Sequence, residues 1–161
     1  MIIAVNYKAK ATDEIIIPTQ SLRLRIIANS NNVNDWQIKM QVKENLEELL
    51  SDLLAGAKTL DDSVNLIENN MMLIDEAVSS VLTPLNETYQ INFGPNAFPV
   101  KTYKGILYPA GNYDSLVIKI GAGAGDNWWC VLFPPLCFLE TNDTSEVEYQ
   151  LYVSRIINYF K

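Results

Sequence analysis

The sequence predicts an α+β fold: a single domain with a mainly antiparallel sheet, two central helices packed on one face, and a C-terminal helix. Two observations predict this fold. Apolar residues recur at helical spacing in the middle of the chain and again at its end, and short β-branched runs lie on both sides of the central helices. Helices gathered between runs of strands are typical of the α+β class, and 161 residues fit one domain, so residues 1–161 are expected to form a single unit.

Three strands are expected before the helices. Residues 2–8 and 14–18 are short runs rich in β-branched side chains. The stretch "SLRLRIIANS" begins at Ser21 and alternates apolar with basic residues, which is typical of a strand with one buried face. The expected buried face holds Leu22, Leu24 and Ile26, and the opposite face holds Arg23 and Arg25.

The first central helix follows a polar cluster. Asn34 is placed to cap it with Gln37 three residues later, and Val33 and Ile38 have the spacing of a hydrophobic staple. Gly56 is expected to end the helix because glycine is the usual residue after a helix C-terminus. The stripe between these ends consists of Val42, Leu46, Leu49 and Leu53.

The second central helix has the strongest periodicity in the chain. Thr59 is placed to cap it with Asp62 at the third helical position, and Pro84 is expected to end it. Its stripe predicts burial against a neighbouring element. The stripe consists of Leu60, Val64, Ile67, Met71, Ile74, Val78 and Val81.

The pattern changes after Thr88. Glycine and proline interrupt short apolar runs between residues 94 and 111, and residues 116–120 form a further β-branched run, which together predict a meander of antiparallel strands. Ser145 and Glu148 then form a capping box that predicts a terminal helix. One face of that helix carries Tyr149, Val153, Ile156 and Phe160.

The composition excludes several classes of function. The formal charge is -7 and the basic residues are scattered, so nucleic acid is not expected as a partner. The chain has no histidine, which removes Ser/His and Cys/His couples and imidazole metal ligands. No run reaches the roughly 18 apolar residues that predict a membrane helix. We therefore expect no enzyme, no metal site, no cofactor and no small-molecule substrate.

A carboxylate-dependent hydrolase is the alternative that this composition leaves open. The candidate acids are expected on helix surfaces and in first turns, where charged side chains are usually solvated. They are Glu47, Glu48, Asp61, Asp62, Asp75 and Glu76. A structural cell-envelope protein is a second alternative.

The motif "GAGAGD", residues 121–126, follows a predicted strand. A dinucleotide-binding fingerprint needs glycine at its sixth position and a helix after it, whereas Asp126 stands there and strand-like residues follow. Gly121, Gly123 and Gly125 are therefore interpreted as shaping a tight turn or permitting close backbone contact, with a glycine-lined recognition loop as the alternative.

Both cysteines lie in "NWWCVLFPPLCF", residues 127–138. Seven steps along a strand would hold Cys130 and Cys137 roughly 23 Å apart, beyond the reach of a disulfide. A disulfide therefore requires the chain to reverse, and residues 133–136 with their two prolines are where it can do so. Two buried free thiols remain the other interpretation.

The same stretch is apolar on both faces if it is extended. Trp128, Cys130 and Leu132 would point one way, and Trp129, Val131 and Phe133 the other. A sheet with helices on one side buries only one of these faces. Either another part of the chain, such as the terminal helix, covers the second face, or it binds another protein through aromatic anchors.

Three segments carry a family resemblance. "PAGNYDSLVIKIGAGAGDNWWCVLFPPLCF" at residues 109–138, "RIIANSNNVNDWQIKMQV" at 25–42 and "FPVKTYKG" at 98–105 resemble the stage II sporulation protein R family of endospore-forming bacteria. The resemblance covers about residues 22–140.

The resemblance implies intercellular signalling. Proteins of this family are made in the forespore and exported into the space between the forespore and mother-cell membranes. There they activate the membrane-embedded aspartic protease that processes the precursor of sigma-E in the mother cell. Members of this family carry an N-terminal export segment that this chain lacks. Removal of that segment would explain the difference.

The resemblance therefore implies the extracytoplasmic part of the protease as the partner. The residues expected to contact it come from the two-faced apolar stretch, and the three glycines are expected to shape the adjacent loop. The expected contacts are Asn127, Trp128, Trp129, Phe133, Pro134 and Pro135.

Overall fold

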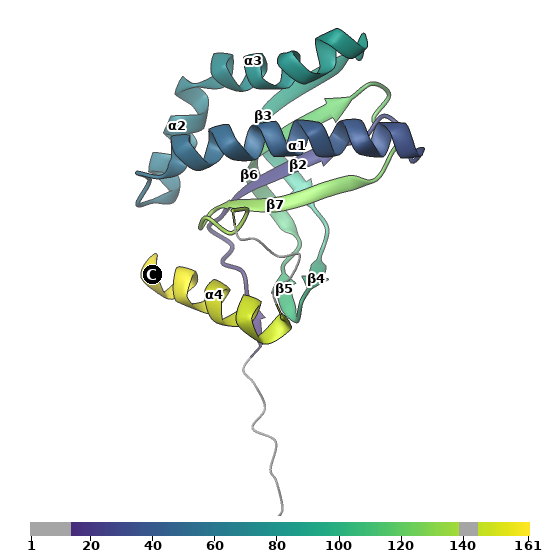
Figure 1. Cartoon of the computed structure of the whole chain (residues 1–161). Coiled ribbons are helices and arrows are strands. Elements are labelled where there is room, and N and C mark those ends of the chain that lie inside the picture. Colours follow the sequence, from purple (N-terminus) through teal and green to yellow (C-terminus); the bar gives the residue numbers. More distant parts are fainter. Residues whose placement is uncertain (1–13, 139–144) are drawn as a thin grey trace, which may run out of the picture.

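The computed structural model describes residues 14–138 and 145–161 of the chain (Figure 1). The strand expected at residues 2–8 lies outside this part. Strands and helices occupy separate segments, and the α+β class is confirmed.

The larger sheet has four strands in the order β3-β6-β2-β7. They are β2 (Leu22–Ile27), β3 (Tyr89–Phe98), β6 (Gly111–Ile120) and β7 (Asn127–Phe133). The β3–β6 and β2–β7 pairs are antiparallel, but the central β2–β6 pair is parallel. The expected simple meander is therefore wrong, because the strand that precedes the helices inserts between two strands that follow them. Its apolar side chains Leu22, Leu24 and Ile26 are fully buried there.

A smaller sheet of three strands lies beside the lower end of the larger one (Figure 1). Its order is β1-β5-β4, with β1 at Ile15–Ile16, β4 at Lys101–Tyr103 and β5 at Ile106–Tyr108. The terminal helix α4 (Glu146–Tyr159) packs here. Val153 and Ile157 of α4 join Ile106 and Val131 in a second hydrophobic core. The capping box of Ser145 and Glu148 begins this helix as predicted.

Three helices cover one face of the larger sheet (Figure 1): α1 (Val33–Leu54), α2 (Leu60–Asn69) and α3 (Met71–Leu82), followed by the short 3-10 turn η1 (Thr83–Leu85). The main core forms between them and the sheet. Its fully buried helix side chains are Val42, Leu46, Leu50, Ile67, Ile74, Val78 and Leu82.

The start of α1 differs from the prediction. Asn32, and not Asn34, caps the helix, because its Oδ1 accepts a hydrogen bond from the backbone N–H of Asp35 at 2.7 Å. The buried stripe continues through Leu50 and Leu54, while Leu49 and Leu53 are half-buried. The helix ends before Gly56, as expected.

The second predicted helix is divided in two. The capping box of Thr59 and Asp62 is present, but α2 stops at Asn69 and α3 begins at Met71. Asn70 has left the helical conformation, with φ -121° and ψ 21°, and its side-chain Nδ2 donates to the carbonyl of Leu66 at 2.8 Å. Such side-chain competition for backbone acceptors is why asparagine favours helix ends.

Candidate recognition groove beside strand β7

The glycine motif forms the connection between β6 and β7 and packs on the segment that joins β2 to α1. Gly121 and Gly123 have positive φ angles of 53° and 63°. At Gly125, a Cβ would clash with the carbonyl oxygen of Ser30. Only glycine allows this approach, so the motif fixes where β7 begins.

Side chains of the β2–α1 segment hold the glycine connection in place. Asn29 Oδ1 accepts from the backbone N–H of Ala122 at 2.9 Å, and Asn31 Oδ1 accepts from that of Asp126 at 2.6 Å. Lys39 Nζ on α1 donates to the carbonyl of Asp126 at 3.0 Å. These hydrogen bonds join the glycine connection to the rest of the protein, and β7 rather than a helix follows the motif.

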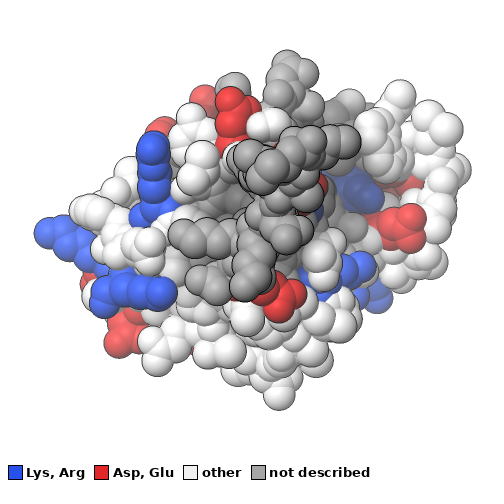
Figure 2. All heavy atoms as spheres, turned by 90° about the horizontal axis from the view of Figure 1, so that it is seen from below, with Lys and Arg blue, Asp and Glu red and all other residues white. Residues whose placement is uncertain are grey.

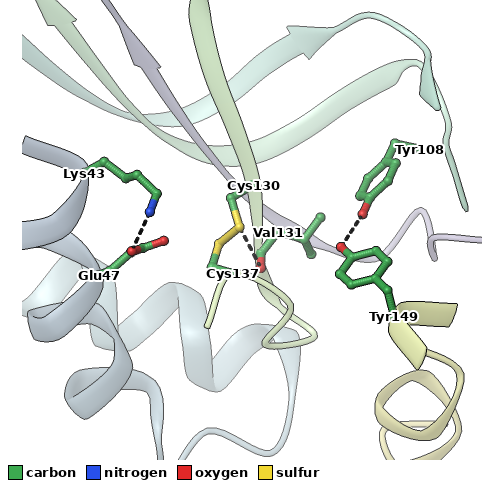
Figure 3. The surroundings of a disulfide bond; sticks show 7 residues. All are labelled: Lys43, Glu47, Tyr108, Cys130, Val131, Cys137 and Tyr149. Atoms are coloured by element: carbon green, nitrogen blue, oxygen red, sulfur yellow. Dashed lines mark hydrogen bonds and ion pairs between the residues drawn. A yellow bond between two sulfur atoms is a disulfide. The ribbon is translucent and has the colours of Figure 1, made fainter. Parts of the chain in front are cut away.

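The chain reverses directly after β7 and returns to it. The Phe133–Pro134 peptide is cis, and the backbone N–H groups of Leu136 and Cys137 both donate to the carbonyl of Val131, at 3.2 and 3.0 Å. This brings the Cα atoms of Cys130 and Cys137 to 5.4 Å, and their sulfurs are joined in a disulfide (Figure 3). The described residues contain no free cysteine.

The two faces of β7 have different surroundings. Trp128 and Cys130 pack against the main core, and Lys43 Nζ of α1 lies 5.2 Å from the centre of the Trp128 ring. On the other face, Val131 is covered by the core that α4 completes. The terminal helix therefore covers one end of the second face.

Trp129 lies further along the second face and is half-buried. Its ring meets that of Phe98 edge to face, with centroids 5.1 Å apart. The cationic groups of Arg25 and Lys101 lie 4.7 and 5.7 Å from its centre. An aromatic ring between two cations is a favourable but still accessible arrangement.

The position of Phe133 in the sequence predicts that it shares the face of Trp129. The structure shows that it does not. A register shift between β2 and β7 places Leu22 opposite Phe133 and Arg23 opposite Val131, which leaves Leu132 as an extra residue. This bulge turns Phe133 into the main core. Phe133 and Pro134 are buried, and Pro135 is half-buried.

A groove of about 1070 Å³ runs beside β7. One wall is α1 and the other is the segment around β4, and Asn127, Trp128 and Trp129 lie between them. Phe133, Pro134 and Pro135 do not line it. The α1 wall contributes Met40, Lys43, Glu44, Glu47, Glu48 and Ser51, and the opposite wall contributes Phe98, Pro99, Lys101, Thr102 and Tyr103.

Arg23 is a groove residue that was not predicted from the sequence, since alternation placed it on the face opposite the expected buried one. It is only 4% exposed, and its guanidinium stacks on Tyr113 at 4.0 Å. Nε donates to Ser21 Oγ at 2.9 Å, whereas Nη2 is buried without a hydrogen-bond partner. Burial lowers the pKa of Arg23. The sequence feature that could have predicted the burial of Arg23 is the set of aromatic residues on the strands after the helices. Phe98, Tyr108 and Tyr113 surround its guanidinium.

The far end of the groove carries a pair of tyrosines. The hydroxyls of Tyr108 and Tyr149 are hydrogen-bonded at 3.0 Å (Figure 3). Burial raises the pKa of both, so both remain protonated at neutral pH. Their contact ties β5 to α4.

The candidate acids are divided between the groove and the surface of other helices. Glu47 and Glu48 both line the groove on α1, where Glu47 forms an ion pair with Lys43 at 2.8 Å (Figure 3), whereas Asp62 accepts the capping bonds of α2. Asp61, Asp75 and Glu76 belong to α2 and α3 and do not line the groove. Within residues 14–138 and 145–161, no three Cys, Asp or Glu side chains come close enough to hold a metal ion.

The surface seen from below in Figure 2 shows Lys and Arg side chains interspersed with Asp and Glu. None of the helices in the described part of the chain combines the length and apolarity needed to cross a bilayer.

Fold and site together define a disulfide-bonded α+β protein with an open groove beside an edge strand. Residues 18–143 match the family described as stage II sporulation protein R. The stage II sporulation protein R of Bacillus subtilis (strain 168) is 33% identical over 138 residues, which are 84% of this chain and 62% of that relative. No solved structure matches. The chain belongs to the stage II sporulation protein R family and is a sporulation protein.

Proposed function

We propose that this domain is an intercellular signal of sporulation. It is secreted from the forespore into the space between the forespore and mother-cell membranes. There it binds the extracytoplasmic part of the mother-cell membrane aspartic protease and favours the active arrangement of that protease, which then cleaves the sigma-E precursor. A ligand shifts such an equilibrium only by binding the active arrangement more tightly.

The groove beside β7 is the observation that carries this proposal. It places two half-buried tryptophans between α1 and the segment around β4, and tryptophan is among the residues that dominate the binding energy of protein interfaces. The disulfide beside it supports secretion, because disulfides persist mainly in oxidising compartments. Family membership supports the sporulation role.

The test is cleavage of the sigma-E precursor in cells that express it with the protease of the same organism. One culture exports the domain across the membrane, and a second retains the same domain inside. Cleavage only with the exported domain supports signalling from outside. Equal cleavage in both cultures, or none when the folded domain is verified outside, rejects the proposal.

A further inference from the structure

Strand β7 is the outer strand of the larger sheet, and among the described residues it pairs only with β2. In an antiparallel pair, the backbone groups of successive residues face alternately toward the partner strand and away from it. The N–H of Ala28 donates to the carbonyl of Asp126 at 3.4 Å, so Trp128 and Cys130 also face β2. The backbone groups of Asn127 and Trp129 therefore face away from the sheet.

The reversal after β7 confirms this assignment and limits the open edge. The carbonyl of Val131 accepts from Leu136 and Cys137, which lie on the outer side of β7. The turn therefore closes the edge at Val131. The outward groups of Asn127 and Trp129 remain at the edge that borders the groove.

The groove has two walls, one on each side of the edge of β7, which is the arrangement that an added strand needs. Its volume of about 1070 Å³ is at the upper end of what is usual for small-molecule sites. A strand added to β7 would point alternate side chains toward α1 and toward the segment around β4. Each set of side chains would therefore meet a different wall.

The charges of the two walls differ. The α1 wall carries Glu44, Glu47 and Glu48, with Lys43 already paired to Glu47. The opposite side carries Lys101 and Arg23, whose buried Nη2 lacks an acceptor. A buried charged donor without a partner is costly, and a carboxylate is the acceptor that satisfies a guanidinium best.

We propose that an extended segment of the partner protein adds to the edge of β7 as a new strand and places a carboxylate against Arg23. Backbone hydrogen bonds to Asn127 and Trp129 supply affinity, and the two walls select the side chains, as in other cases of strand addition. An acidic side chain faces Arg23 and Lys101, while neutral or basic side chains face α1. This proposal rests on the proposed function, because it names how the protease is bound.

The first test uses overlapping synthetic peptides that cover the extracytoplasmic segments of the protease. Amide hydrogen exchange of the whole chain is measured by NMR with and without each peptide. Binding is expected to slow the exchange of the Asn127 and Trp129 amides. The amides of Trp128 and Cys130, which face β2, serve as internal controls and keep their rates. A bound peptide that leaves Asn127 and Trp129 unchanged overturns the proposal.

The second test uses Arg23→Met, which keeps a long side chain but removes the charge. It is expected to weaken the binding of the peptide identified in the first test by roughly tenfold or more. Arg155→Met, at an exposed position on α4, is the matched control and leaves affinity unchanged. Replacing the acidic residue of the peptide by its amide should weaken binding to the native chain but not to Arg23→Met. Equal losses on both proteins contradict the pairing.

Cleavage in cells separates the two proposals. If the exported domain triggers cleavage but no peptide binds at β7, strand addition is wrong and the proposed function stands. If a peptide protects Asn127 and Trp129 but the exported domain never triggers cleavage, strand addition stands as a binding mode and the proposed function fails.

Discussion

The guanidinium of Arg23 stacks 4.0 Å from the centre of the Tyr113 ring, yet its Nη2 has no hydrogen-bond partner. The aromatic ring compensates part of the lost hydration, but the charge stays buried and its pKa is lowered. A buried charge whose hydrogen bonds are incomplete contributes little to the stability of the free domain.

Replacing Arg23 by methionine should therefore leave the stability of the free domain almost unchanged. The change removes the bond to Ser21 but also removes the buried charge, so we expect the free energy of unfolding to stay within about 1 kcal/mol of the native value. Urea unfolding of Arg23→Met and of Arg155→Met measures this. A loss above about 2 kcal/mol would show that the guanidinium stabilises the free fold.

Removal of the disulfide should lower stability moderately. The bridge joins residues with a sequence separation of 7, and a loop this short corresponds to about 2 kcal/mol in the chain-entropy description. Urea unfolding of the double variant Cys130→Ser with Cys137→Ser measures the loss. Reductant should destabilise the native chain by a similar amount and leave the double variant unaffected.

Gly125→Ala should destabilise the domain by about 1–3 kcal/mol, because the new Cβ meets the backbone of Ser30. Gly56→Ala is the matched control: nothing lies within 4 Å of its Cβ, so its effect should stay within about 0.5 kcal/mol. Thermal unfolding of both variants tests the comparison. Equal midpoints would mean that the glycine connection does not depend on close contact.

Trp129→Ala should reduce activation of the protease without unfolding the domain. Trp129 is half-buried at the groove, and truncation of such an anchor typically costs about 2 kcal/mol of binding free energy, which is roughly thirtyfold. Tyr159→Ala is the control, since that ring is 80% exposed outside the groove. Dose dependence of precursor cleavage is the measurement, and full activity of the folded variant would remove Trp129 from the interface.

The cap of α2 should make stability depend on pH in acid. Asp62 accepts hydrogen bonds from the backbone N–H groups of Lys58 and Thr59, which lower its pKa below the ordinary value of 3.8. Because the folded state favours the carboxylate, its contribution is complete above pH 3.8 and is lost as the pH falls through the lowered pKa.

An NMR titration of the Asp62 carboxyl carbon measures that pKa directly. The stability of Asp62→Asn should vary less with pH over the same range. A carboxyl that titrates at or above its ordinary pKa would contradict the cap.

Local patterns predicted much of the fold. The capping boxes at Thr59 and Ser145 and the alternation in β2 each depend on residues a few positions apart, and the structure contains all three. The exchange of Asn34 for Asn32 as the cap reflects a choice among adjacent asparagines. Asn32 lies in a local hydrogen-bond network around Asp35, whose carboxylate accepts from Asn29 and Asn32.

Features that depend on distant partners were not predictable from such patterns. The bulge that turns Phe133 inward depends on its pairing with Leu22, and the burial of Arg23 depends on Tyr113. The break at Asn70 is different, because asparagine is itself a local signal for a helix end. The prediction gave more weight to the continuous apolar stripe and therefore expected a single helix. Of the groove, the sequence predicted Asn127, Trp128 and Trp129 but neither the α1 wall nor Arg23.

The position of β2 in the sheet has a consequence for folding. Residues 23–27 pair with residues 115–119 on one side and with 127–131 on the other, so both neighbours of this strand are synthesised about ninety or more positions later. Closing such long loops slows folding relative to local pairing. A nascent chain that ends before residue 115 lacks both neighbours of its central strand, and the domain therefore completes its sheet only after nearly all of it has been made.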